Sequence, residues 1–457
     1  MKKILLLSLI LLFPSFLQAG GPWKVDTITN SGVPARWPYD EDTGKWIIHW
    51  RVDPGPMTDG AIRVSSEAAV RDWIQPMLTE WQSVKLPYAA DADPIQTVAI
   101  EFVLDGELPE DITAANYERW LEPGEGRYTP AFVIFDHDGS ILEAMGEEYD
   151  KNKLVGLAEP LLDSTEMRIR GGYIILNGRM INGNPSSTTD AEATPEQFKA
   201  VIKHEFGHLL NLAHAVVNTE IALGCAGDSC NGNQGISTMF PDLRTVAQYT
   251  LHVDDKVGIS WLYPTQDFQD KFCVITGEIQ DEDGKGLQGV NVIASAVNDP
   301  WIDARSFQSG ALYAIGTENG RYILAGLMPG VDYEVRYEEL PVTEETDISA
   351  GYDPCSTECP SGFGSGLIAG PDGAASVHCD EGGRTIGMET LKISLAEGRA
   401  IDGSVSEGEG GGGGSGKKGW CQLERTADYG LRTTNFLGVF VFILILLAFR
   451  LHIGRAR

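Results

Sequence analysis

The sequence predicts an α+β region followed by an all-β region, and three observations support this division. A strand, a helix and a second strand are expected between Trp46 and Leu104, a helix with a clear start signal follows Thr194, and short strands separated by tight turns follow Phe272. The 53 glycines and 23 prolines also favour a turn-rich architecture over a helical bundle. We therefore expect a twisted mixed sheet that carries a long helix, with a β-sandwich after it.

The charge balance argues against nucleic acid as a partner. The 457 residues include 35 Lys and Arg against 65 Asp and Glu, which gives a formal net charge of −30. A protein that neutralises phosphates needs a basic face, and this chain would repel a polyanion over most of its surface. The composition is otherwise that of a globular protein, long enough for two or three domains.

The first residues, 1–19, are typical of a secretory signal peptide. Lys2 and Lys3 precede an apolar run from Ile4 to Phe13, and Ala19 is a small residue at the expected cleavage site. The run is too short to cross a bilayer, whose apolar core is roughly 30 Å thick. We therefore expect an exported bacterial protein that is displayed at the cell surface, anchored in the membrane or released.

A glycine-rich linker, an apolar segment and a basic tail follow one another at the C-terminus. The linker covers 403–419, the apolar segment 436–453 and the tail 450–457. This order resembles the C-terminal sorting signals of bacterial surface proteins, which a membrane peptidase cleaves. A permanent transmembrane helix with a cytoplasmic basic end is the alternative, so contact with a membrane is expected through this segment.

The α+β region begins with a strand–helix–strand unit. Residues Trp46–Val52 and Thr97–Leu104 are rich in apolar and β-branched side chains, and Val64–Val84 between them is expected to be a helix. Two further strands are expected at Ala131–Phe135 and Tyr173–Leu176, each closed by Asp or Asn and Gly in turn positions.

The long helix has a marked start. Thr194 is suited to be the N-cap, Pro195 to the first helical position, and Gln197 to return the hydrogen bond of a capping box. Apolar residues then recur at helical spacing from Phe198 to Leu210, so one face of the helix should be buried.

The same helix carries a metal-binding pattern. His204 and His208 are four residues apart, about one turn, so both imidazoles project from one side and can bind one ion. Glu205 stands beside them, where it can take a proton from water. His214 can reach the same ion only if the helix stops, and Asn211 is suited to the stop because it tolerates positive φ. Three imidazoles leave one position of a zinc ion open, which is the arrangement of catalytic sites.

These residues resemble the motif of the metzincin metalloproteases, H-E-x-x-H-x-x-G-x-x-H, from which the chain departs by Asn211 in place of Gly. Residues 237–241, Ser-Thr-Met-Phe-Pro, look like the methionine turn of that family, with Met239 as the floor below zinc. Asp254-Asp255 and the segment Trp261–Pro264 resemble the end of matrixin catalytic domains. The resemblance implies a metzincin-type catalytic domain, which we place at 22–264.

Further properties are implied by the resemblance. The substrate should lie antiparallel to an edge strand of the sheet, for which Leu154–Glu159 is the candidate. Some metzincins have a tyrosine ligand two residues after the turn methionine, but this chain has Pro241, so no such ligand is expected. Only about 25 residues separate the signal from the first strand, so no propeptide is expected, and these residues contain no Cys that could bind zinc and keep the enzyme latent.

Three weaker features accompany the motif. Residues Asp136–Gly139, Asp-His-Asp-Gly, could offer oxygens to Ca²⁺ or form only an acidic β-turn, which is the favoured interpretation. His49 and His137 have no clustered partners and are not expected to bind metal. Cys225 and Cys230 are expected to form a disulfide across a short loop, because an exported protein meets an oxidising compartment.

The all-β region resembles the carboxypeptidase regulatory-like β-sandwich and covers 272–340. A Cys-containing extension, 341–402, follows, with Thr390–Leu395 as a closing strand. Cys273 and the three cysteines of the extension allow two bridges in three connectivities, and the sequence does not choose among them. These are Cys273, Cys355, Cys359 and Cys379. Cys421 is left over and could be free, lipid-modified or part of the sorting signal.

The functional prediction is a monomeric zinc-dependent endopeptidase. His204, His208 and His214 are the expected ligands of one Zn²⁺, and Glu205 is the expected general base that deprotonates a zinc-activated water for attack on a peptide bond. Protein or peptide is the expected substrate. The alternative is a surface adhesion protein in which a catalytically weak domain of this type serves to bind.

Overall fold

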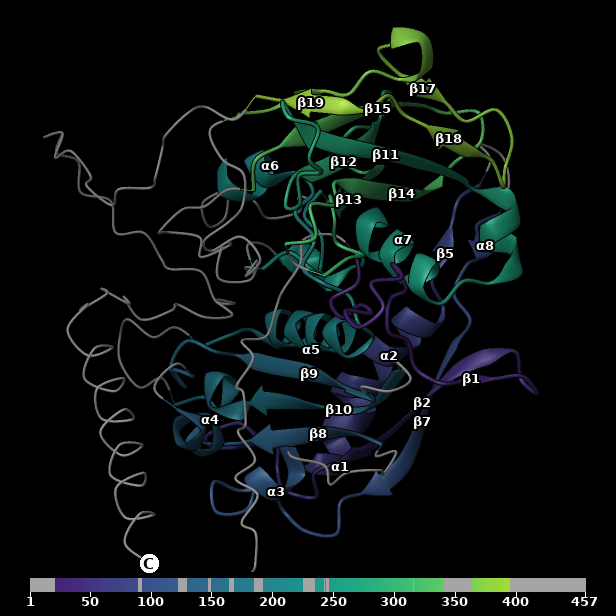
Figure 1. The fold of residues 1–457 in the computed structure, drawn as a ribbon. Helices are drawn as coiled ribbons and strands as arrows, with labels where there is room; N and C mark the ends of the chain where they lie inside the picture. The colour runs from purple at the N-terminus through teal and green to yellow at the C-terminus, as the bar shows by residue number, and fades with distance from the viewer. Residues whose placement is uncertain are drawn as a thin grey trace, which may run out of the picture. The chain divides into compact units, whose positions relative to one another are not determined.

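In a computed structural model, the described residues all fall within one compact unit, Met1–Glu424 (Figure 1). They are 21–88, 93–121, 130–146, 149–163, 168–184, 192–224, 235–241, 243, 246–314, 316–340 and 363–394. The predicted signal peptide, linker, apolar segment and basic tail lie outside them. Within the described part of the chain, no helix is long and apolar enough to cross a bilayer.

The N-terminal half builds a mixed sheet in the order β7-β2-β8-β10-β9, with the short β1 paired to the start of β2. Strands β7, β2, β8 and β10 are parallel, whereas β9 runs antiparallel to β10. Among the described strands β9 pairs only with β10 and forms an edge of the sheet. The bounds are β1 Tyr39–Asp40, β2 Lys45–Val52, β7 Ile100–Glu107, β8 Ala131–Asp136, β9 Gly156–Asp163 and β10 Arg168–Asn177.

The predicted strand–helix–strand unit is present. The helix is divided into α1 (Ser66–Ala69), a π-helical segment (Val70–Ile74) and α2 (Gln75–Gln82). Pro76 explains the division, because it lacks the N–H that an α-helix would bond to the carbonyl four residues back. The expected edge strand at Leu154–Glu159 corresponds to β9, which begins two residues later and continues to Asp163.

Helix α5 (Pro195–Leu209) packs against the sheet beside β9 and β10 (Figure 1). It begins as predicted, with the Thr194 hydroxyl accepting from the Gln197 amide and the Gln197 side chain accepting from the Thr194 amide. Buried aromatic side chains hold it in place. Phe206 meets Trp50 of β2 edge to face, and the Trp81 indole N–H donates to the carbonyl of Lys203.

The C-terminal half is a β-sandwich of two sheets, β14-β11-β18 with β19 on β11, and β13-β12-β15-β16 with β17 on β15. The described part of the predicted extension, 363–394, thus supplies strands to both sheets, including the expected closing strand, β19. The bounds are β11 Cys273–Asp281, β12 Asn291–Ala296, β13 Ala304–Gln308, β14 Arg321–Leu327, β15 Asp332–Glu338, β16 Gly366–Leu367, β17 Val377–His378, β18 Thr385–Gly387 and β19 Leu391–Ile393.

Short elements complete the described fold. Two of them, α7 and α8, connect the two halves, and α7 contacts strands β13 and β14. The bounds of all these short elements are β3 Thr58–Asp59, β4 Arg63–Val64, β5 Lys85–Leu86, β6 Ile95–Gln96, α3 Glu118–Leu121, α4 Ser140–Met145, α6 Thr219–Gly224, α7 Val253–Leu262 and α8 Gln266–Lys271. The expected combination of an α+β region with a mixed sheet and a β-rich region is therefore confirmed.

A disulfide joins Cys273 at the start of β11 to Cys379 just after β17, which selects one pair from the four candidate thiols. Cys355 and Cys359 lie outside the described residues, as do Cys225, Cys230 and Cys421. Because the bridge spans a sequence separation of 106, it removes a large loop entropy from the unfolded chain.

We predict that replacing both Cys273 and Cys379 with Ala lowers the free energy of unfolding by about 3–5 kcal/mol. Chemical denaturation of the variant and the wild-type protein measures the difference. Alkylation followed by intact-mass measurement provides the control, since it reports whether both thiols are oxidised in the wild-type protein. Equal stability of the two proteins would contradict the assignment of a stabilising bridge.

Candidate metal centre

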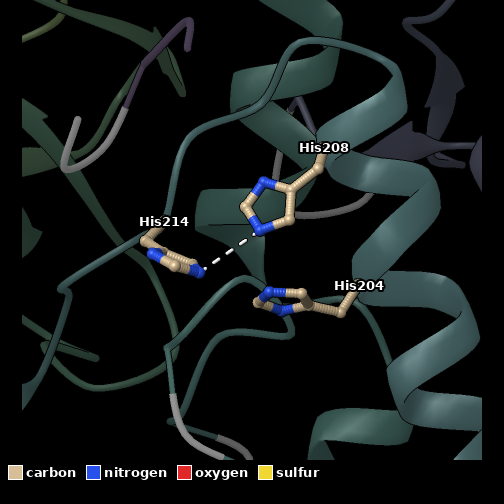
Figure 2. Close-up of side chains that lie close together, drawn as sticks. All are labelled: His204, His208 and His214. Atoms are coloured by element: carbon tan, nitrogen blue, oxygen red, sulfur yellow. Dashed lines mark hydrogen bonds between the residues drawn. The ribbon is translucent and has the colours of Figure 1, made fainter. Parts of the chain in front are cut away.

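Three buried imidazoles converge at the C-terminal end of α5. His204 and His208 project from the helix, and His214 reaches them from the segment that follows (Figure 2). The Nε2 atoms of His208 and His214 are 3.2 Å apart, and the three residues offer ligand atoms that all lie within 4.8 Å of one another. The structure thus brings together the three histidines that the sequence predicts as ligands.

Backbone carbonyls orient two of the rings. Nδ1 of His204 donates to the carbonyl of Thr238 at 2.8 Å, and Nδ1 of His208 donates to the carbonyl of Leu212 at 2.9 Å. A proton held on Nδ1 leaves Nε2 as the lone-pair nitrogen, which is the form that binds a metal. Burial lowers the pKa of His204 to about 4 and that of His208 well below its usual value, so both rings are neutral near pH 7.

Glu205 follows His204 on α5 and has no exposed surface. Neither carboxylate oxygen has a hydrogen-bond partner among the described residues, and burial raises the pKa of the group to about 8. The edge strand approaches closely, since a Cβ built on Gly156 of β9 would be 2.9 Å from Oε1 of Glu205. A buried carboxyl group without compensating hydrogen bonds is unfavourable in its charged form, and a nearby cation would reverse that preference.

Asn211 turns the chain back toward the helix. Its φ is 70°, in the left-handed region expected for the residue that ends this helix. Its side chain is buried and bonds to the N-terminal segment: Oδ1 accepts from the amide of Lys24 at 2.6 Å, and Nδ2 donates to the carbonyls of Lys24 and Ala35. The residue therefore stops the helix and also ties residues 21–37 to its end.

Met239 packs against helix α5 at Gly207. A Cβ built on Gly207 of α5 would be 2.3 Å from the Met239 sulfur, so a larger residue at this position would have to displace the methionine side chain. The Asp255 carboxylate of α7 holds the turn by accepting from the amides of Thr238 and Met239 and from the hydroxyl of Ser237. Because the Thr238 carbonyl accepts from His204, Asp255 indirectly positions that ring.

The residues present fit a zinc ion. Three neutral imidazoles are a usual ligand set for catalytic zinc, and a tetrahedron with bonds of roughly 2.0–2.1 Å separates its ligand atoms by about 3.3 Å. The 3.2 Å between the His208 and His214 nitrogens is close to that value. Nε2 of His204 is fully buried and has no hydrogen-bond partner among the residues described, as expected of a nitrogen that binds a metal ion.

The other sequence candidates lie elsewhere. His49 pairs with Asp105 on exposed surface. The carboxylate oxygens of Asp136 accept hydrogen bonds from the backbone amides of Ile141 and Leu142 in α4. This use of both oxygens within the protein favours the interpretation as an acidic turn over that as a calcium site. In the described part of the chain, the three histidines are the single group of three or more potential metal-ligating residues that meets this geometry.

Sequence reasoning missed the N-terminal segment. Trp23 is 4% exposed and its ring centroid is 5.1 Å from that of His208. The amide of Trp23 donates to the carbonyl of Asn211, and the amide of Ala213 donates to the carbonyl of Gly21, so the segment pairs with the chain between the second and third histidines. Lys24 then forms an ion pair with Glu159 of β9 at 2.9 Å. No periodic pattern marks these residues in the sequence.

We predict that Asn211→Gly and Asn211→Ala separate the contribution of the left-handed backbone at Asn211 from that of its side-chain hydrogen bonds. Both variants lose the side-chain hydrogen bonds, which should lower the free energy of unfolding by about 2–4 kcal/mol. Alanine should lower it by roughly 1 kcal/mol more, because a Cβ is strained at this φ. Urea unfolding of both variants in chelator tests this, and equal stability of the alanine and glycine variants would contradict a strained left-handed position.

Comparisons with known proteins do not name a family. No family model matches the chain, and no curated protein matches it. Solved structures give partial similarities. A group B streptococcus pilus 2b backbone protein shares 14% identity over 27% of this chain and 41% of its own, with a TM-score of 0.17. The phospholipase PlaB from Legionella pneumophila shares 10% over 33% of this chain and 32% of its own, with a TM-score of 0.16. These overlaps are too low to carry an argument, so the site rests on its own geometry.

Proposed function

We propose that this chain is a zinc-dependent endopeptidase of the metzincin type. The observation that carries the proposal is the convergence of three buried imidazoles, together with the buried carboxyl group of Glu205, which follows His204 on α5 and has no hydrogen-bond partner in the described residues. Three histidines would hold the ion and leave a position open, whereas a structural zinc site uses four protein ligands. Bound zinc would supply Lewis acidity, which polarises a carbonyl and makes water a nucleophile near neutral pH.

The residues of the chain have distinct parts in this reaction. Glu205 would accept a proton from the attacking water and deliver it to the leaving amine, because it is the carboxylate next to the ligands. His204 and His208 would bind the ion through Nε2, because the bonds that Nδ1 makes to backbone carbonyls keep the proton on the other nitrogen. Met239 packs against Gly207, which keeps the turn that carries the Thr238 carbonyl close to the helix.

The edge strand suits an extended peptide. β9 borders the sheet and passes beside Glu205 at Gly156. A peptide that added to this edge would gain backbone hydrogen bonds without a demand on its sequence, and its carbonyls would pass close to the metal centre. Protein or peptide is therefore the proposed substrate class.

Export fits the described structure. The Cys273–Cys379 disulfide is expected in an oxidising compartment and is uncommon in the cytosol. A cell-surface or extracellular location is the proposed one, and the alternative of a non-catalytic adhesion protein is separated from the protease by the experiment below.

We predict that the zinc-loaded protein cleaves casein or a quenched peptide library, and that Glu205→Gln lowers kcat/KM by at least about 10²-fold. The glutamine keeps the shape of the side chain but cannot accept the proton. Zinc content measured by elemental analysis should be unchanged in this variant, because Glu205 is not a ligand.

The matched control is His214→Ala, which should lose both zinc and activity. A chelator should abolish cleavage by the wild-type protein, and added zinc should restore it. Cleavage that persists in Glu205→Gln would overturn the assigned role of the glutamate. A zinc-loaded wild-type protein that cleaves nothing in a broad library would favour the adhesion alternative.

A further inference from the structure

The segment that carries His214 has little secondary structure of its own. Residues 213–216 lie between α5 and α6 without helix or strand, yet Val216, Val217 and Asn218 have no exposed surface. The position of the third histidine therefore depends on what packs around this segment. The N-terminal segment contacts one part of it, through the bond between Ala213 and Gly21.

Strand β12 of the sandwich contacts the segment directly. The side chain of Asn291, which is fully buried, donates from Nδ2 to the carbonyl of Val216 at 2.9 Å, two residues after His214. Val217 packs in a small buried cluster with Ile293 of β12 and Ala304 of β13. A backbone carbonyl of the ligand segment is thus satisfied by the sandwich.

The turn between β12 and β13 makes a second connection. The carbonyl of Trp301 accepts from Nδ2 of Asn218 at 2.7 Å and from Nε2 of His252 at 3.1 Å. His252 is the N-cap of α7, the helix that carries Asp255. Asn218 has a φ of 59°, so its backbone is in the left-handed region at the point where the ligand segment meets this turn.

Strand β13 connects to the methionine turn through α7. The amide of Ser306 donates to Oδ1 of Asp254 at 2.5 Å, and the hydroxyl of Ser306 lies 3.2 Å from Oδ2. Asp254 precedes Asp255, whose carboxylate holds the turn that bonds to His204. The sandwich therefore reaches the metal centre at two places, the segment of His214 and the turn under His204.

We propose that strands β12 and β13 of the sandwich position the metal centre, with Asn291 as the positioning residue for the segment of His214. This inference rests on the proposed metal site and assigns to the sandwich a role in metal binding. A ligand held by a loop needs outside support to stay within the narrow range of zinc geometry, and loss of such support typically weakens metal binding 10- to 100-fold.

The test is metal binding by Asn291→Ala, compared with the wild-type protein and with Ser295→Ala. Ser295 is a matched control because it is a buried polar residue on the same strand whose side chain bonds to Arg336 within the sandwich. Chelator competition with Zn²⁺ measures affinity, and the absorption spectrum of the Co²⁺ protein reports ligand geometry. Asn291→Ala should bind Zn²⁺ about 10- to 100-fold more weakly and change the Co²⁺ spectrum, whereas Ser295→Ala should do neither.

A second variant keeps the test informative if Asn291→Ala does not fold. Asn218→Gly keeps a left-handed backbone accessible and removes the bond to Trp301, so it should also weaken Zn²⁺ binding. Thermal unfolding in chelator shows whether each variant is folded without metal. Unchanged Zn²⁺ affinity in both Asn291→Ala and Asn218→Gly would overturn this inference alone. Absence of Zn²⁺ binding by the wild-type protein would overturn the proposed function and this inference with it.

Discussion

The end of helix α5 is the constraint on which the candidate site depends. Two histidines one turn apart share a face of any helix, but the third is six residues beyond the second and can join them only if the chain reverses. Asn211 makes that reversal possible because its φ of 70° is tolerated by asparagine, and its buried amide bonds on both sides to the N-terminal segment. The convergence of the imidazoles follows from this stop.

Buried hydrogen bonds to backbone atoms then determine where each ring points. The carbonyls of Thr238 and Leu212 accept from His204 and His208, and Asp255 holds the turn that contains Thr238. The contact of His208 is local, since Leu212 is four residues further along, whereas the contacts of Thr238 with His204 and Asp255 join separate elements. A polar network of this kind is costly when a partner is missing, so it favours one arrangement of the chain around the site.

Much of the site was predictable because its signals are local. The capping box at Thr194, the histidine spacing and the stop at Asn211 each depend on a few neighbouring residues, and the structure has all three. The main strands of the sheet were also predictable from apolar runs, although the helix before β7 is interrupted at a π-helical segment near Pro76. The contacts of Trp23 and Lys24 were not, because nothing near them in the sequence marks what they will touch.

The sequence by itself therefore determined which residues can bind a metal, on which helix they stand and where that helix ends, since hydrogen bonding and backbone preference act over a few residues. Tertiary structure alone decided what surrounds them: the N-terminal segment against His208, the edge strand beside Glu205, the disulfide partner of Cys273, and the sandwich strands behind His214. These contacts join residues tens to hundreds of positions apart, and their pairing depends on the packing of whole layers, which no local pattern encodes.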